Sequence, residues 1–186
     1  MKNRARSDEG GRDLPPTPAG RCLNVGCGRD LRAGWVNVDV EAIPGAIRAS
    51  ITHLPLQDGA LDYVLASHVL EHVPDVKRAI AELARILRTG GTLEIRAPDY
   101  RHENAYTDLE HLHFFTPRSM DYFAEGSETY RHRYAPLFSR VHVKEVREHP
   151  GYPGQRFVRR LAPSVDRFLV GEGGAPAELR FYCVKR

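Results

Sequence analysis

The segment SHVLEHVPD, residues 67–75, contains the side chains of this sequence that could most directly take part in chemistry. His68, Glu71 and His72 have the spacing H-x-x-E-H, which on a helix can bind zinc and supply a general base. Alternatively, these residues form the loop after a strand, where an α/β protein binds its ligand. The neighbouring elements of the chain distinguish a metal site from a ligand-binding loop.

Pro74 argues against the zinc site. Such a site needs a continuous helix that holds both histidines on one face, together with a third ligand. His68 directly follows the strand-like run LDYVLAS, and Pro74 suits the first position of the next helix. A helix over residues 68–72 would therefore end as soon as it formed. We expect a ligand-binding loop here and no bound metal.

The chain alternates strand patterns with helical or loop connections. Apolar, alternating or β-branched runs predict seven strands. These lie at residues 21–25, 35–40, 46–51, 61–67, 92–98, 139–148 and 178–186. The clearest helix is 74–88, where apolar residues recur every three or four positions. A short helix is expected to begin at Thr116, and another helical pattern covers 155–170. This order predicts an α/β fold with a mostly parallel sheet, whose ligands bind at the carboxyl ends of the strands.

The first two connections between strands are too short for helices. RDLRAG (29–34) allows only a turn, and EAIPG (41–45) is shorter still, whereas a parallel crossover needs about a dozen residues. One face of the sheet should therefore have reduced helical cover. We expect the segment 155–170, or a second subunit in a possible homodimer, to shield that face.

Glycines and a carboxylate mark the first ligand-binding loops. Gly26-Cys27-Gly28 ends the first strand, and glycines there let a ligand approach the backbone. A third glycine would fall at position 31, which is leucine, so a pyrophosphate cradle for NAD is not supported. Asp39 ends the second strand, 11 residues after Gly28. A carboxylate at that place can accept hydrogen bonds from ribose hydroxyls.

Length and composition favour one soluble domain. The chain has 186 residues, 41% of them hydrophobic and 27% charged, and no apolar run approaches the roughly 18 residues of a membrane helix. Residues 1–20 lack the apolar core of a secretory signal, so we expect a disordered leader before a single domain over 21–186. We expect a cytoplasmic protein, without stable membrane insertion. The net charge of +3 does not favour nucleic acid as a partner. The Arg-rich segment 156–167 also has an apolar face, which we expect to pack on the sheet; contact of this segment with a membrane surface or nucleic acid is the alternative.

Four motifs give the chain a family resemblance. In sequence order they are LNVGCG, GWVNVDV, LPLQDGALDYVLASHVLEHVPD and ELARILRTGGTLEIRAPDY. Together they resemble class I S-adenosylmethionine-dependent methyltransferases, and most closely the small ubiquinone/menaquinone-biosynthesis-type methylases, from about residue 21 to 125. The resemblance implies a Rossmann-like, mostly parallel sheet of seven strands with an antiparallel C-terminal strand. It also implies methyltransferase activity with S-adenosylmethionine as cofactor.

The resemblance also assigns the cofactor contacts. The corresponding positions are Asn24, Gly26, Cys27, Gly28, Asp39, Val40, Ser50, Ile51, Ser67 and His68. The glycine loop and the residues that end the strand 61–67 would lie beside the methionine part of the cofactor. Asp39 would bind the ribose, and the residues around Val40 and Ser50 would surround the adenine.

Two of these positions depart from the family pattern. The family usually carries an acidic residue at the position of Asn24, near the amino group of the cofactor, and an aspartate at the position of Ser50, near the adenine amine. Asparagine and serine can accept the same hydrogen bonds, although without the charge. Both departures are expected to lower the affinity for the cofactor.

A second polar cluster, HENAYTDLEHLHFFTPRSM (102–120), follows the fifth strand. His111 and His113 would share one side if this stretch is extended, with Tyr106 nearby in sequence. We expect all three to line the acceptor site in a segment that folds over the cofactor. Packing within the structure and metal binding are the alternatives for the two histidines.

The expected reaction transfers the sulfonium methyl group to a small-molecule or glycan-type acceptor, at oxygen. Because that methyl group is already electrophilic, the protein mainly aligns donor and acceptor and excludes water. A hydroxyl acceptor benefits from a general base, and His72 is the candidate, since histidine titrates near neutral pH; a capping or surface role is its alternative. The second hypothesis is a catalytically silent cofactor-binding or scaffold protein of the same fold, which Asn24 and Ser50 would favour.

Overall fold

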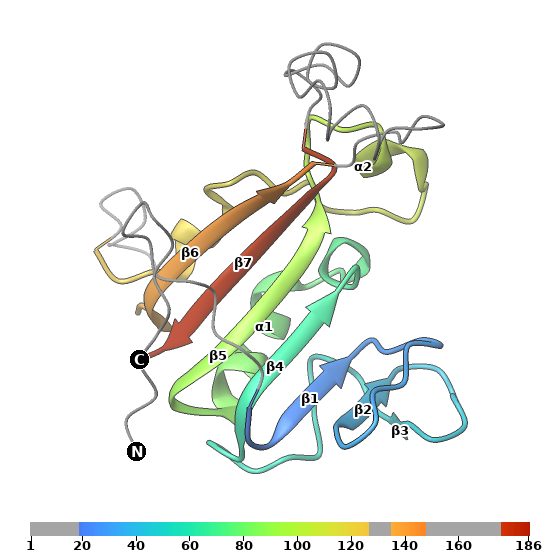
Figure 1. Ribbon diagram of the computed structural model, residues 1–186, viewed down its shortest axis with the longest axis vertical. Coiled ribbons are helices and arrows are strands. Elements are labelled where there is room, and N and C mark those ends of the chain that lie inside the picture. The colour runs from blue at the N-terminus through green and yellow to red at the C-terminus, as the bar shows by residue number, and fades with distance from the viewer. Residues whose placement is uncertain (1–18, 127–134, 148–175) are drawn as a thin grey trace, which may run out of the picture.

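The computed structural model describes residues 19–126, 135–147 and 176–186 (Figure 1). Its strands are β1 (Cys22–Val25), β2 (Val36–Asp39), β3 (Ile47–Arg48), β4 (Leu61–Ser67), β5 (Leu87–Pro98), β6 (Phe138–Val146) and β7 (Glu178–Lys185). Its helices are the α-helices α1 (Val76–Ile86) and α2 (Asn104–Thr107) and the 3-10 helices η1 (Leu70–His72) and η2 (Ser119–Phe123). None of the described helices has the length and apolar character needed to cross a membrane.

The strands form one seven-stranded sheet in the order β3-β2-β1-β4-β5-β7-β6. Neighbouring strands are parallel in the part of the sheet ordered β3-β2-β1-β4-β5. Strand β7 runs antiparallel to both of its neighbours, β5 and β6 (Figure 1). The predicted α/β fold class, the seven strands and the antiparallel C-terminal strand are thus confirmed. The chain reverses its direction of progress across the sheet between β1 and β4, which is where such sheets bind ligands.

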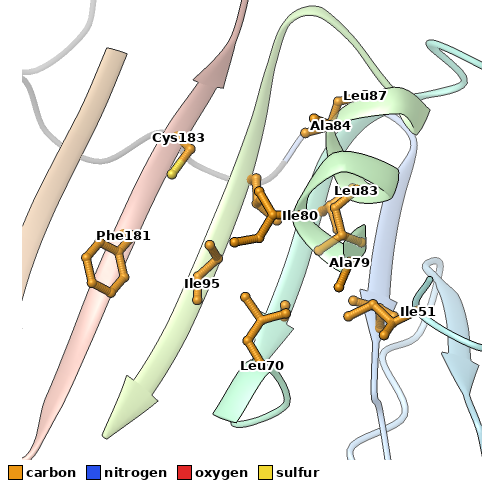
Figure 2. Packing of buried hydrophobic residues seen from close by; sticks show 14 of the residues in the cluster. Ile51, Leu70, Ala79, Ile80, Leu83, Ala84, Leu87, Ile95, Phe181 and Cys183 are labelled. Carbon is orange, nitrogen blue, oxygen red and sulfur yellow. The ribbon is translucent and has the colours of Figure 1, made fainter. Parts of the chain in front are cut away.

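Most of the core lies between helix α1 and the sheet. Val64 and Ala66 of β4 and Ile95 of β5 belong to the same buried cluster as Ile80 and Leu83 of the helix. Figure 2 shows Ala79, Ile80 and Leu83 on the side of α1 that faces β4 and β5. A central parallel strand is covered on both faces, which explains why β4 is an almost continuous apolar run.

The opposite face of the sheet carries a smaller cluster of Cys22, Tyr63 and Leu65, with Trp35 packed against it. The rings of Trp35 and Tyr63 meet edge to face, 5.9 Å apart. The β1–β2 and β2–β3 connections contain no helix, as their lengths predicted. The segment 155–170, expected to shield this face, lies outside the described residues.

Several boundaries differ from the predicted ones. Helix α1 covers 76–86 rather than 74–88, because Asp75 caps it and the chain turns into β5 at Leu87. Strand β3 contains two residues rather than six, since the chain leaves the sheet at Ser50 to form a turn with His53. The helix expected after Thr116 is the 3-10 helix η2, and α2 was not anticipated.

We expect Asp75→Ala to lower the free energy of unfolding by about 1 kcal/mol. The Asp75 carboxylate accepts a hydrogen bond from the backbone N–H of Arg78 at 3.0 Å and satisfies one of the unpaired donors of the first turn. Urea denaturation measures the loss. Asp75→Asn retains an acceptor at this place, so its free energy of unfolding should remain within about 0.5 kcal/mol of that of the wild type. A loss in Asp75→Asn as large as the loss in Asp75→Ala would contradict a capping role for the acceptor oxygen.

Candidate active site

A pocket of about 570 Å³ opens at the carboxyl ends of β1, β2 and β4. This volume lies within the usual range for sites that hold small molecules and cofactors. It is lined by Val25, Gly26, Asp39, Val40, Ala49, Ser50, Ile51, Thr52, His68, Val69, His72, Val73, Pro74, Asp75 and Arg78. Seven residues predicted from the sequence are among these: Gly26, Asp39, Val40, Ser50, Ile51, His68 and His72. We call this hollow the first pocket.

Gly26 lines this pocket where β1 ends. Its φ is +64°, and a Cβ at this position would lie 2.3 Å from Cγ2 of Val69. A side chain would therefore be strained in backbone conformation and would overlap the segment after β4. The glycine lets the backbone itself form the pocket wall.

Asp39 joins the two strand ends beside the pocket. Its Oδ2 accepts a hydrogen bond from the backbone N–H of Gly28 at 2.8 Å, and its Oδ1 accepts one from the N–H of Glu41 at 3.0 Å. Each carboxylate oxygen can accept a further hydrogen bond. The side chain is thus held in place at the pocket wall and keeps acceptor capacity for a ligand.

Four predicted cofactor contacts lie outside the pocket lining: Asn24, Cys27, Gly28 and Ser67. Cys27 is buried, and its N–H donates to the carbonyl of Val38. Asn24 is also buried, and its amide donates to the carbonyl of Asp30 at 2.6 Å and to Asn37. Ser67 is the last residue of β4. Asn24 therefore stabilises the β1–β2 connection in this structure.

His68 stands between two carboxylates. Its Nε2 lies 2.9 Å from Oε2 of Glu178, and its Nδ1 lies 3.4 Å from Oε1 of Glu71. The hydrogen bond to Glu178, followed by the interaction with Glu71, raises the pKa of His68 to about 9. Its φ of +54° is unusual for a residue other than glycine, and its N–H donates to the carbonyl of Arg96.

A second pocket, of about 860 Å³, adjoins the first one. Its lining is His68, Glu71, His72, Pro98, Asn104, Thr107, Asp108, Leu109, Glu110, His111, Ala177 and Glu178. His68 and His72 line both pockets. The loop 99–115, which extends beyond β5 and includes α2 (Figure 1), brings His111 to this place.

The structure separates the three residues expected to line an acceptor site. His111 lines the second pocket, and its ring lies 4.7 Å from that of His72. His113 bonds through Nε2 to the carbonyl of Val73 and lines another hollow, next to α1 and η2. Tyr106 is exposed; its hydroxyl donates to the carbonyl of Tyr100 and its ring stacks on Phe114. Of these three residues, His111 alone lines the second pocket.

Sequence reasoning did not select Glu178, Val69 or the carboxylate of Glu71 as site residues. Glu178 is 110 positions away from His68 in the chain, so no local pattern connects them. Val69 is an ordinary apolar residue in the sequence, although here it packs against Gly26. Glu71 carried a signal in the H-x-x-E-H spacing, but its environment depends on the distant loop 99–115.

The interaction of His68 with Glu178 should depend on pH. The pKa of His68 in the folded protein, about 9, lies above its ordinary value of 6.5. The interaction between protonated His68 and Glu178 therefore stabilises the fold fully below pH 6.5, and this stabilisation is lost as the pH rises from 6.5 to about 9. We expect the difference in unfolding free energy between wild type and Glu178→Gln to shrink over that range, by no more than about 1 kcal/mol because the imidazole is half exposed.

Urea denaturation at pH 6, 7.5 and 9 measures this difference. Glu145→Gln is the matched control: Glu145 pairs with Arg101 on the same sheet at 2.7 Å, and arginine does not titrate in this range. If the difference in unfolding free energy between wild type and Glu178→Gln changed with pH as little as that of the control, the interaction between His68 and Glu178 would be contradicted.

Comparison with known proteins agrees with the motifs and the fold. Residues 23–95 match a family model described as a methyltransferase domain. A demethylmenaquinone methyltransferase of Thermobifida fusca is 40% identical over 73 residues, which cover 36% of this chain and 31% of that protein. An uncharacterized methyltransferase of Mycobacterium sp. (strain JLS) is 41% identical over 95 residues, covering 40% of this chain and 38% of the relative. The chain thus spans about a third of the length of the curated relatives it matches.

Solved structures extend the likeness to the whole sheet. The crystal structure of an S-adenosylmethionine-dependent methyltransferase from Archaeoglobus fulgidus superposes with a TM-score of 0.60 at 18% identity. The match covers 89% of this chain and 86% of the other. The Rossmann-like fold is therefore that of these enzymes. The methyltransferase resemblance found in the sequence is thus supported for residues 23–95 by the family model, and for the fold by the solved structures.

Proposed function

We infer that this chain, which has the class I S-adenosylmethionine-dependent methyltransferase fold and carries a methyltransferase domain in residues 23–95, transfers the methyl group of S-adenosylmethionine to an acceptor. The acceptor we propose is a small molecule or a glycan, methylated at oxygen. The observation that carries the proposal is the first pocket, which both Gly26 and Asp39 line.

The lining of the first pocket suits the three parts of the cofactor. Asp39 offers acceptors for the ribose hydroxyls, since its remaining lone pairs border the pocket. The exposed side chain of Val40 and the hydroxyl of Ser50 border the place for the adenine. Gly26 presents only its backbone to the pocket, beside Val69, and the methionine part can lie along this backbone. When bound, the cofactor supplies an electrophilic methyl group.

The second pocket is the place we assign to the acceptor. It meets the first pocket at His68 and His72, so a molecule bound there can approach the methyl group directly. Holding donor and acceptor in a reactive geometry is worth about 7–11 kcal/mol of the barrier. We assign the activation of an acceptor hydroxyl to His72, which lines both pockets.

A catalytically silent cofactor-binding or scaffold protein is the second candidate. The uncharged residues at positions 24 and 50 favour it, since both replace carboxylates that are usual in the family. The amide of Asn24, however, supports the β1–β2 connection through Asp30 and Asn37. Its departure from the family pattern is therefore compatible with an intact pocket.

Calorimetric titration of the full chain with S-adenosylmethionine and S-adenosylhomocysteine tests the proposal. We expect both to bind with one molecule per chain, and methyl-labelled cofactor to pass its label to compounds in a small-molecule or oligosaccharide fraction. Heat with both ligands but no transferred label would favour the silent cofactor-binding protein. No heat with either ligand would contradict both the donor and the pocket assignment.

A further inference from the structure

The carboxylate of Glu71 is buried without a hydrogen bond. The residue is 1% exposed, and neither Oε1 nor Oε2 has a hydrogen-bond partner among the described residues. His68 Nδ1 approaches Oε1 to 3.4 Å, which is close enough for an ion pair, but it makes no hydrogen bond there. An ionised carboxylate in such surroundings is costly unless it is paired and hydrogen-bonded or binds a cation, and the ion pair with His68 leaves both oxygens without a hydrogen bond.

His72, the next residue, has a second unpartnered atom. Its Nδ1 is buried and has no hydrogen-bond partner among the described residues. Glu71, His72 and His111 each offer a ligand atom, and these atoms all lie within 4.8 Å of one another. Two nitrogen ligands and a carboxylate oxygen therefore converge in the lining of the second pocket, where His72 also borders the first pocket.

His111 is oriented for coordination by its own hydrogen bond. Its Nδ1 lies 2.9 Å from the carbonyl of Ala105, and because a carbonyl only accepts, Nδ1 carries the proton. Nε2 then keeps its lone pair. Metal-binding histidines are commonly fixed in this way by a backbone carbonyl. The loop itself is tied to the cluster, since the carbonyl of Glu71 accepts hydrogen bonds from the N–H groups of Leu112 and His113.

We propose that Glu71, His72 and His111 bind a divalent transition-metal cation such as Zn²⁺ or Mn²⁺. Two imidazoles and one carboxylate are a ligand set of catalytic zinc sites, which keep a further position open. Imidazole ligands favour these ions over Mg²⁺, which prefers oxygen. Ligand atoms around tetrahedral Zn²⁺ lie about 3.3 Å apart, so the three groups need to close by up to about 1.5 Å, a change within reach of side-chain rotation.

The surroundings of the cluster favour a cation. Four carboxylates line the second pocket, from Glu71, Asp108, Glu110 and Glu178, and none of its lining residues in the described chain is lysine or arginine. Glu178 is already paired with His68 and Arg180. The carboxylate of Asp108 lies 3.9 Å from Nε2 of His111 and adds to the local negative charge.

The use of this cation rests on the proposed methyl transfer. The open position would face the second pocket, where it can bind an acceptor oxygen and lower the pKa of an acceptor hydroxyl. The acceptors that fit are compounds with hydroxyl groups able to coordinate a metal. In this arrangement His72 acts as a ligand, and the cation takes over the activation expected from His72 as a general base.

The proposal differs from the zinc site that the H-x-x-E-H spacing suggested. That site would pair His68 with His72 on one helix, whereas the structure engages His68 with Glu178. The second imidazole comes instead from His111, 39 positions after His72 in the chain. The sequence expectation of no metal at residues 68–72 was based on the missing helix, and metal binding by His111 was an alternative for the loop 102–120.

Titration of the untagged, metal-stripped chain tests the site. We expect one Zn²⁺ per chain by calorimetry, no binding of Mg²⁺ at the same concentrations, and a visible absorption band with Co²⁺ that Zn²⁺ abolishes. Glu71→Gln and His111→Ala should each weaken Zn²⁺ binding at least 10- to 100-fold, since even second-shell changes cost about that much. His142→Ala, on β6, is the matched control and should bind as the wild type does.

Circular dichroism of each variant verifies folding, and Glu71→Gln preserves the shape of the side chain if His111→Ala does not fold. Absence of saturable Zn²⁺ and Co²⁺ binding, or wild-type affinity in both ligand variants, would overturn the proposal. The two proposals can fail separately: Asp39→Ala should lose S-adenosylhomocysteine but retain Zn²⁺, and Glu71→Gln should lose Zn²⁺ but retain S-adenosylhomocysteine.

Discussion

Replacing Asp39 with alanine is expected to weaken S-adenosylhomocysteine binding about 100-fold. The change removes a charged acceptor for the ribose hydroxyls, and hydrogen bonds to charged groups contribute about 1.5–3 kcal/mol each. A loss of 2.8 kcal/mol corresponds to about 100-fold in the dissociation constant. The variant also removes the acceptor for the N–H of Gly28, so the β1–β2 wall loses a support. Calorimetry at constant pH and salt measures the change.

Two further variants separate the charge from general damage. Asp39→Asn keeps an acceptor oxygen but not the charge, so we expect a loss of about 10-fold. Glu41→Ala is the matched control: this exposed residue contributes only its backbone N–H to Asp39, and binding should remain within about twofold. If the dissociation constant of Asp39→Ala for S-adenosylhomocysteine stayed within about threefold of the wild-type value, the assignment of the ribose to this carboxylate would be contradicted.

Gly26→Ala should lower both stability and cofactor binding. The left-handed backbone conformation costs an alanine about 1–2 kcal/mol, and the overlap with Val69 adds about 1–3 kcal/mol. For a chain of this size the sum corresponds to a fall in Tm of about 5–15 °C. The new methyl group, or the displaced Val69, would also narrow the first pocket. Thermal unfolding and calorimetry measure the two effects.

Gly28→Ala supplies the matched comparison. Gly28 also has a positive φ, of +47°, but a Cβ there meets no atom within 4 Å. This variant should show the backbone cost alone, about 1–2 kcal/mol. Combining Gly26→Ala with Val69→Ala should recover part of the overlap cost through a favourable coupling. Equal losses in Gly26→Ala and Gly28→Ala, with no coupling to position 69, would disprove the close contact.

The location of Asp39 and of the loop Gly26–Gly28 at one edge of the sheet could be predicted from the sequence because it follows from local order. The loop begins directly after a short apolar run and Asp39 lies at the end of another, and neighbouring parallel strands place their carboxyl ends at one edge. The reduced helical cover followed in the same way from the lengths of two loops. Such features depend on spacing along the chain, which the sequence displays directly.

The cluster around His72 could not be predicted in this way. Glu178 reaches His68 because β7 inserts antiparallel between β5 and β6, and His111 reaches His72 because the carbonyl of Glu71 binds the following residues of the loop. Both contacts arise from tertiary packing. Tyr106 shows the converse, since its position in the sequence suggested the acceptor site, yet it packs on Phe114 at the surface.

A crystal structure of the full chain with S-adenosylhomocysteine tests the central claim most directly. We expect both ribose hydroxyls within hydrogen-bond distance of the Asp39 carboxylate, the homocysteine part along the backbone at Gly26, and the sulfur directed toward His72. An adenosyl group bound elsewhere, or an Asp39 carboxylate that contacts only the N–H groups of Gly28 and Glu41, would contradict the account.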